Sequence, residues 1–320
     1  MKAIMYHYVK EDDPSFPNFN HLHIEDFKKQ LDYLGNKFGF VTKKDFQDAL
    51  ESGDPPKGVV LTFDDGLKCH YDQVFPVLKE RGLWGIFYVA TEMYRTQKLS
   101  DVHRIHLLLG QENNQKIYEY LNEKIPQDYL VDFVREDFKK LTYTRQINDD
   151  FTKMVKKILN YYISYTYREK VIDDLCELFL KKEDLNVLDF YLTAEEMVEM
   201  ENAGMIIGSH SASHPVMSKL DLETQKIEIQ SSFSDLKNFG LKLSCKSFCY
   251  PYGGFHTFTK ETEALLEMEK CRFSFNVESR DISKKDLTER KQALPRYDCN
   301  EFPFGQVRRI GKVHSSSYSI

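Results

Sequence analysis

Short apolar segments alternate with amphipathic segments over the first ninety residues, and this alternation constrains the fold more than any other feature of the sequence. Segments 2–9, 58–63 and 84–90 are apolar and of strand length, whereas 23–39 and 71–82 carry apolar residues at helical spacing. Strands that alternate with helices are typical of parallel sheets, because each helix returns the chain to the start of the next strand. The sequence therefore predicts an α/β fold, either a parallel sheet or a barrel.

The alternation is interrupted in the middle of the chain. Residues 91–186 are rich in Lys, Glu, Asp, Tyr and Leu, are nearly free of glycine, and show helical periodicity. A capping-box pattern at Thr193 and Glu196 then starts a new helix, and the alternation resumes. We therefore expect three parts: a discontinuous α/β domain (1–94 and 187–310), a helical insertion or cap (95–186) and a loose C-terminal tail (311–320).

Composition excludes several classes of function. The chain has 320 residues, 41% of them hydrophobic, and its formal charge of −6 gives no basis for a nucleic-acid or anionic-membrane partner. No segment approaches the roughly 20 apolar residues that span a bilayer. The apolar stretch at the N-terminus is too short for the apolar region of a signal peptide. The six cysteines are scattered, which is typical of reduced thiols, so we expect a cytoplasmic protein. Cys245 and Cys249 are interpreted as buried strand residues in preference to metal ligands.

Charged and imidazole side chains follow two of the apolar segments. Asp64 and Asp65 come directly after 58–63, and two anions this close resist joint ionisation unless a cation or hydrogen bonds hold them. The pair therefore either caps the next helix or belongs to a site. His210 and His214 follow another apolar segment at a spacing that lets two imidazoles share one divalent metal. Because sites in parallel α/β folds are built at the carboxyl ends of strands, we expect these four side chains to meet in a metal site with open coordination positions.

Three motifs in this order carry a family resemblance: TFDDG (62–66), HSASHP (210–215) and FCYPYG (248–253). The chain resembles the polysaccharide deacetylases of the NodB-homology type, carbohydrate esterase family 4, over roughly 1–90 and 190–300. The resemblance implies a distorted (β/α) barrel carrying the large helical insertion. It also implies a divalent metal, with zinc the first expectation and cobalt, nickel or manganese as alternatives. The activity that it implies is removal of acetyl groups from N-acetylated sugars.

The resemblance assigns roles to particular residues. It implies that Asp64 is the general base and that Asp65, His210 and His214 bind the metal, which activates a water molecule and polarises the amide carbonyl. The backbone N–H of Tyr252 is expected to stabilise the developing oxyanion. The substrate is expected to contact the same loop, at Pro251, Tyr252 and Gly253.

The chain also departs from the family pattern. The third motif has Cys249 where the family usually has an arginine that orients the catalytic aspartate. We propose that Arg296, at the end of another short strand segment, supplies this guanidinium; the alternative is that Arg296 forms an unrelated ion pair. The motif that carries the general acid is not evident, and His7, His256 and His314 are the candidates.

The leading hypothesis is a cytoplasmic, metal-dependent N-deacetylase acting on a sugar intermediate, in the biosynthesis of a surface polysaccharide or glycoconjugate. We also consider an amide hydrolase acting on a non-sugar or N-formyl substrate, and a carbohydrate-binding protein that has lost catalysis. Phosphoryl transfer by paired aspartates would require basic residues near the site, and the segment offers only Lys68. The particular sugar, the native metal, the general acid, the role of the insertion and the oligomeric state are not determined by the sequence.

Overall fold

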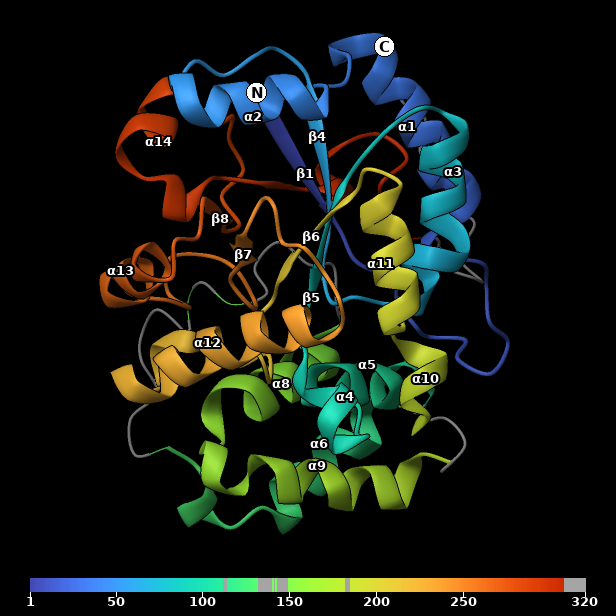
Figure 1. Ribbon diagram of the computed structural model, residues 1–320. Coiled ribbons are helices and arrows are strands. Elements are labelled where there is room, and N and C mark those ends of the chain that lie inside the picture. Colours follow the sequence, from blue (N-terminus) through green and yellow to red (C-terminus); the bar gives the residue numbers. More distant parts are fainter. Residues whose placement is uncertain (112–113, 132–139, 141, 143–148, 182–184, 308–320) are drawn as a thin grey trace.

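Seven parallel strands form the central sheet of the computed structural model within the residues that it describes (Figure 1). The structure describes residues 1–111, 114–131, 140, 142, 149–181 and 185–307. In spatial order the strands are β8 (Phe273–Phe275), β7 (Ser247–Cys249), β6 (Ile206–Ser209), β5 (Ile86–Val89), β4 (Val59–Phe63), β1 (Lys2–Tyr6) and β9 (Tyr297–Asp298). A second, two-stranded parallel sheet pairs β2 (Val9–Lys10) with β3 (Leu22–His23).

The segment that ends in β9 joins the two edges of the sheet. Leu294 forms a parallel bridge with Phe275 of β8, and the backbone N–H of Glu278 donates to the carbonyl of Arg296. Tyr297 then pairs with Ile4 of β1. The strands therefore curl into a distorted barrel, as the sequence predicts, and Arg296 lies in the segment that closes it.

Alternate residues of each strand face opposite sides of the barrel wall. Val60 and Tyr88 belong to an inner cluster of buried side chains, whereas Leu61 and Phe87 belong to the cluster that packs beneath the outer helices. This alternation follows from the two-residue period of a β-strand. It places the even-numbered residues at the end of β4 inside the barrel.

Helices cover the outside of the barrel. Those that alternate with its strands are α1 (Ile24–Phe38), α2 (Lys43–Ser52), α3 (Phe75–Glu80), α11 (Ala194–Asn202), α12 (Leu222–Asn238), α13 (Lys260–Met268) and α14 (Lys284–Glu289). The capping box expected at Thr193 and Glu196 is confirmed, and the Thr42 side chain caps the N-terminus of α2 in the same way, by accepting from a backbone N–H three residues on. Two boundaries differ from expectation: segment 2–9 is two strands, and the predicted helix at 71–82 begins with a π-helical turn, His70–Val74.

The segment between β5 and β6 forms a helical layer at one end of the barrel (Figure 1). Its helices are α4 (Glu92–Thr96), α5 (Asp101–Gln111), α6 (Asn114–Lys124), α8 (Asp150–Lys157), α9 (Tyr165–Phe179) and α10 (Val187–Phe190). Four of them, α5, α6, α8 and α9, share a hydrophobic core of their own, which includes Ile105, Leu121, Val155 and Ile172. Parts of the predicted helical insertion, and the tail expected at 311–320, lie outside the described residues. None of the described helices is both long and apolar enough to cross a membrane.

Candidate active site

Asp64 and Asp65 reach the same site although neighbouring residues of a strand point to opposite sides. β4 ends at Phe63, and the backbone N–H of Asp64 still donates to the carbonyl of Tyr6, 2.9 Å away, so Asp64 keeps the strand register and points inward. Asp65 has a φ of +81°. This left-handed conformation is rare for a residue other than glycine, and it turns the second carboxylate back toward the first.

A buried ion pair holds Asp64. The Nη1 and Nη2 atoms of Arg296 donate to its two carboxylate oxygens at 2.8 and 2.7 Å, and Nη1 also donates to Thr62 Oγ1 at 3.0 Å. Asp64 is 2% exposed and Arg296 is fully buried. Burial alone would raise the pKa of Asp64, but the Arg296 guanidinium outweighs it and lowers that pKa to about 2. Asp64 is therefore an oriented carboxylate throughout the physiological pH range.

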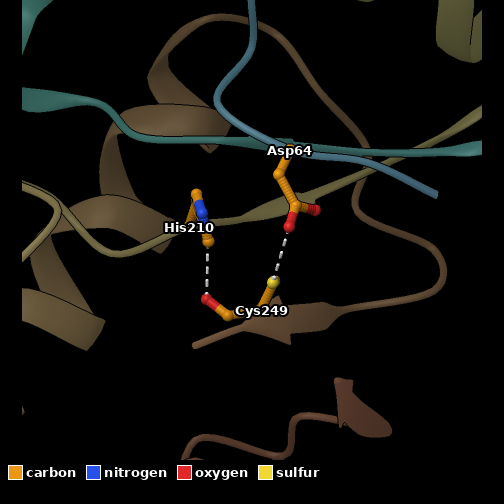
Figure 2. Close-up of side chains that lie close together, drawn as sticks. All are labelled: Asp64, His210 and Cys249. Carbon is orange, nitrogen blue, oxygen red and sulfur yellow. Dashed lines mark hydrogen bonds between the residues drawn. The ribbon is translucent and has the colours of Figure 1, made fainter. Parts of the chain in front are cut away.

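Cys249 lies beside Asp64, the acidic member of this ion pair (Figure 2). Its thiol donates to Asp64 Oδ2 over 3.5 Å, and Arg296 Nη2 lies 2.9 Å from its sulfur. Burial raises the pKa of the Cys249 thiol, so it remains protonated and can act as a donor. The guanidinium thus reaches Asp64 from the barrel-closing segment, and the small side chain of Cys249 leaves room for it.

Asp65, His210 and His214 converge on one point. The Nε2 atoms of His210 and His214 each lie 3.4 Å from Asp65 Oδ1, and the three atoms form a group whose members are all within 4.8 Å of one another. A tetrahedral zinc site with bonds of about 2.1 Å places its ligand atoms about 3.4 Å apart. Asp65 Oδ1 is buried and has no hydrogen-bond partner among the described residues. The donor set and its spacing therefore fit a divalent metal.

Neighbouring groups orient both imidazoles. His210 Nδ1 donates to the carbonyl of Cys249 at 2.7 Å (Figure 2), which directs the Nε2 lone pair at the metal position. Burial lowers the pKa of His214 to about 4, so this imidazole is neutral and able to bind a metal. The turn between the two histidines is held by the Glu228 carboxylate, which accepts hydrogen bonds from the backbone N–H groups of Ala212 and Ser213.

Asp64, His210 and Cys249 form a second cluster of potential ligands among the described residues. The Arg296 guanidinium already occupies the Asp64 carboxylate and contacts the sulfur. A metal placed there would lie against this cation. We therefore assign the metal position to the cluster of Asp65, His210 and His214 alone.

The loop after β7 places Tyr252 beside the metal position. Its ring centre lies 5.0 Å from that of His214, and its hydroxyl donates to Asn160 Oδ1 at 3.1 Å. Pro251 and Gly253 are buried on either side of it. Gly253 has a φ of +62°, and a Cβ there would lie 2.3 Å from Val277 Cγ2, so the loop requires glycine at this position.

The three candidate acids lie in different surroundings. His7 follows β1, the strand next to the one that carries Asp64, and its charge contributes to the low pKa of Asp64. The ring centre of His256 lies 6.4 Å from that of Tyr161 in the helical layer. His314 lies outside the described residues. Of the three, His7 has the most direct relation to Asp64.

Sequence reasoning missed one residue of the site, His103. It lies in α5, is fully buried, and its Nε2 is 3.2 Å from Asp65 Oδ2. Burial alone would raise the pKa of Asp65, but His103, followed by His210 and His214, holds that pKa well below its usual range. The only sequence signal was a pair of histidines three positions apart, His103 and His106, in an otherwise apolar helix of the insertion.

The sequence model of the polysaccharide deacetylase family matches residues 51–125 and 179–271, more than half of the chain. The chain therefore belongs to the polysaccharide deacetylase family, as the motifs indicate, and the family implies a sugar substrate. The match includes Asp64, Asp65, His210 and His214, extends into the insertion, and stops before Arg296. A search of curated proteins by sequence finds no match.

Solved structures show the same fold. The chain is similar to the deacetylase PplD of Streptococcus pyogenes, solved in complex with acetate, with 15% identity and a TM-score of 0.57 over 93% of this chain and 91% of the other. It is also similar to a polysaccharide deacetylase of Bacillus cereus, with 14% identity and a TM-score of 0.52 over 93% and 64%. The deacetylase domain of BpsB from Bordetella bronchiseptica has 12% identity and a TM-score of 0.50 over 93% and 94%.

Proposed function

We propose that this protein is a metal-dependent N-deacetylase that hydrolyses the acetamide of an N-acetylated sugar. The observation that carries the proposal is the side-by-side arrangement of two differently held aspartates. Asp64 is bound by Arg296 at both oxygens, whereas Asp65 Oδ1 faces two imidazole nitrogens at 3.4 Å. A metal scaffold alone would need only the second aspartate, so the oriented first aspartate supports catalysis.

Each group has a separate task in this proposal. Bound to Asp65, His210 and His214, a divalent metal supplies Lewis-acid polarisation of the amide carbonyl and of a water molecule. Asp64 accepts the proton of the water that attacks the carbonyl carbon. Arg296 keeps the Asp64 carboxylate ionised and fixes its direction. The backbone N–H of Tyr252 is expected to donate to the carbonyl oxygen as negative charge develops there.

The reaction is completed when the carbon–nitrogen bond breaks and the leaving amine takes up a proton. The products are acetate and a free amino sugar. Acetate is also the molecule bound in the similar deacetylase of Streptococcus pyogenes. His7 is our candidate for the acid that protonates the amine, because it follows β1 at the barrel end where Asp64 lies.

We propose a cytoplasmic sugar intermediate of surface-polysaccharide or glycoconjugate synthesis as the substrate. The scattered cysteines of the sequence support a reducing compartment. The helical layer supports a restricted substrate, because Arg168 of α9 donates to the Tyr252 hydroxyl at 3.3 Å and Tyr165 of α9 accepts from the backbone N–H of Val216 at 2.8 Å. These contacts place the helical layer directly over the loops of the site.

The test is acetate release from a panel of N-acetylated sugar nucleotides, lipid-linked sugars and oligosaccharides, with N-formyl and non-sugar amides beside them. Wild type is compared with Asp64→Asn, each loaded with zinc and then treated with a chelator. We expect metal-dependent acetate release, and a loss of about 10²–10⁴-fold in kcat for Asp64→Asn with metal content unchanged. Metal binding without release from any substrate would contradict the proposal and favour a binding protein. Release from the formyl or non-sugar amides alone would identify a different amide hydrolase.

A further inference from the structure

The helical layer contributes a side chain to the second oxygen of Asp65. His103 Nε2 lies 3.2 Å from Asp65 Oδ2, while His210 and His214 face Oδ1. His103 is fully buried, and among the described residues its Nε2 forms no hydrogen bond of full geometry, although Asp65 Oδ2 lies within ion-pair distance of it. A buried imidazole N–H without a partner is costly, so Asp65 Oδ2 is the acceptor that this position provides.

A neighbouring tyrosine sets the tautomer of His103. The backbone N–H of Ser100 donates to the Tyr191 hydroxyl at 3.1 Å, and the same hydroxyl lies within hydrogen-bond distance of His103 Nδ1. Two hydroxyl groups, those of Tyr191 and Ser100, thus face Nδ1 and can each donate a hydrogen to it. The neutral imidazole then carries its own hydrogen on Nε2, directed toward Asp65.

The elements that carry these groups are fixed to the site. Asp101, at the start of α5, accepts from Arg168 at 2.6 Å and from Arg104. Arg168 in turn donates to the hydroxyl of Tyr252. Tyr191 forms an antiparallel bridge with Leu67, two residues after Asp65. The position of His103 is therefore tied to the catalytic loops on both sides.

The geometry makes His103 a donor to a ligand and not a ligand itself. The ring centres of His103 and His214 are 6.3 Å apart, whereas those of His210 and His214 are 4.7 Å apart. His103 does not belong to either group of potential metal ligands found among the described residues. It faces the Asp65 oxygen other than the one that His210 and His214 face.

We propose that His103 is a positioning residue of the metal centre: it holds Asp65 Oδ2 so that Oδ1 alone is presented to the metal. The helical layer would then complete the metal centre as well as cover it. This inference rests on the proposed function, because it assumes that Asp65 is a metal ligand. Partners of this kind typically change metal affinity by about 10–100-fold when they are removed.

The experiment measures zinc affinity by competition with a chromophoric chelator for wild type, His103→Ala, His103→Gln and His106→Ala. We expect His103→Ala to weaken zinc binding by about 10–100-fold. His103→Gln, whose amide N–H reaches a similar position, should restore most of the affinity. His106→Ala is the matched control, since His106 lies one turn along α5 and contacts the Tyr8 hydroxyl instead of Asp65. Thermal unfolding of each metal-free variant shows whether it is folded.

The absorption spectrum of the cobalt-loaded protein distinguishes the role of His103. If His103 only positions Asp65, His103→Ala saturated with cobalt should have the same type of absorption spectrum as wild type, because the metal keeps the same ligands. A change in coordination number would overturn the assignment, because it would make His103 a direct ligand. Zinc affinity in folded His103→Ala and His103→Gln equal to that of wild type would show a purely structural role. If wild type itself binds no metal, the proposed function is contradicted, and the inference about His103 is contradicted with it.

Discussion

Arg296 binds both oxygens of Asp64, 232 residues away in the sequence, at 2.8 and 2.7 Å inside the barrel. The segment that carries Arg296 is also the segment that joins β8 to β1. The contact that closes the barrel therefore also orients the Asp64 carboxylate, the general base of the proposed function. Asp64 is thus held by a guanidinium although Cys249 stands where the family usually has arginine.

Replacement of Arg296 should damage both folding and turnover. Arg296→Gln leaves the Asp64 carboxylate buried without its cation, and loss of one partner of a buried pair destabilises proteins by about 3–5 kcal/mol. The pKa of Asp64 should rise from its value of about 2, because burial is no longer outweighed. We expect lower kcat and an acid limb of kcat/KM at higher pH than in wild type. Urea unfolding and the pH profile of acetate release measure the two effects.

An arginine at the family position should compensate for that loss in part. Cys249 Sγ lies 3.5 Å from Asp64 Oδ2, and removal of the Arg296 guanidinium vacates the space beside it. The double variant Cys249→Arg/Arg296→Gln should therefore recover part of the activity that Arg296→Gln loses. Cys249→Arg in the wild-type background should be destabilising, because two guanidinium groups would compete for one carboxylate. Equal activity of Arg296→Gln and the double variant would argue against an orienting role for the guanidinium.

Lys219, which contacts the helical layer, should make the free energy of unfolding depend on pH. Its Nζ faces the backbone carbonyls of Tyr161 and Ile163 at 3.4 and 3.2 Å, and burial, together with the charge of Arg168, lowers its pKa to about 7. An unfolded lysine titrates near 10.4. Between these values the unfolded chain binds more protons, so this group makes the free energy of unfolding rise with pH, by at most about 1.4 kcal/mol per pH unit.

Lys219→Met removes this contribution. The stability of wild type relative to Lys219→Met should increase from pH 7.5 to pH 9.5, as measured by urea unfolding at each pH. Lys226→Met, at a more exposed lysine that pairs with Glu223 on the surface of α12, is the control and should show no such trend. A difference between wild type and Lys219→Met that stays constant with pH would show that Lys219 is not desolvated in the folded protein.

Gly253→Ala should displace the loop that carries Tyr252. The new Cβ would lie 2.3 Å from Val277 Cγ2 at a φ of +62°. The left-handed conformation costs about 1–2 kcal/mol for a residue with a side chain, and overpacking typically adds about 1–3 kcal/mol. We expect a fall in kcat beyond any loss of folded protein. Gly253→Ala/Val277→Ala removes the contact with Cγ2 but keeps the Cβ of residue 277, 2.8 Å from the new Cβ. The double variant should therefore recover only part of the loss, as measured by unfolding and kinetics on both variants.

Local signals in the sequence were sufficient for the barrel strands, most of the helices and the motif residues. Apolar runs of strand length followed by Asp64, Asp65 and His210 place these residues at strand ends, and the parallel topology brings strand ends together. The spacing of His210 and His214 is itself a short-range property. The caps at Thr42 and Thr193 were predictable for the same reason, since they depend on residues three positions away.

Only the tertiary structure decided the contacts between distant segments. The sequence left two roles open for Arg296, and barrel closure decided for the one that reaches Asp64. His103 reaches Asp65 because a helical layer packs over the strand ends, and this contact was not predicted. Neither contact leaves a periodicity or a spacing in the sequence, since each depends on how two separately folded surfaces meet. The sequence by itself determined which residues could carry the chemistry; packing across the barrel decided which neighbours hold the two aspartates in place.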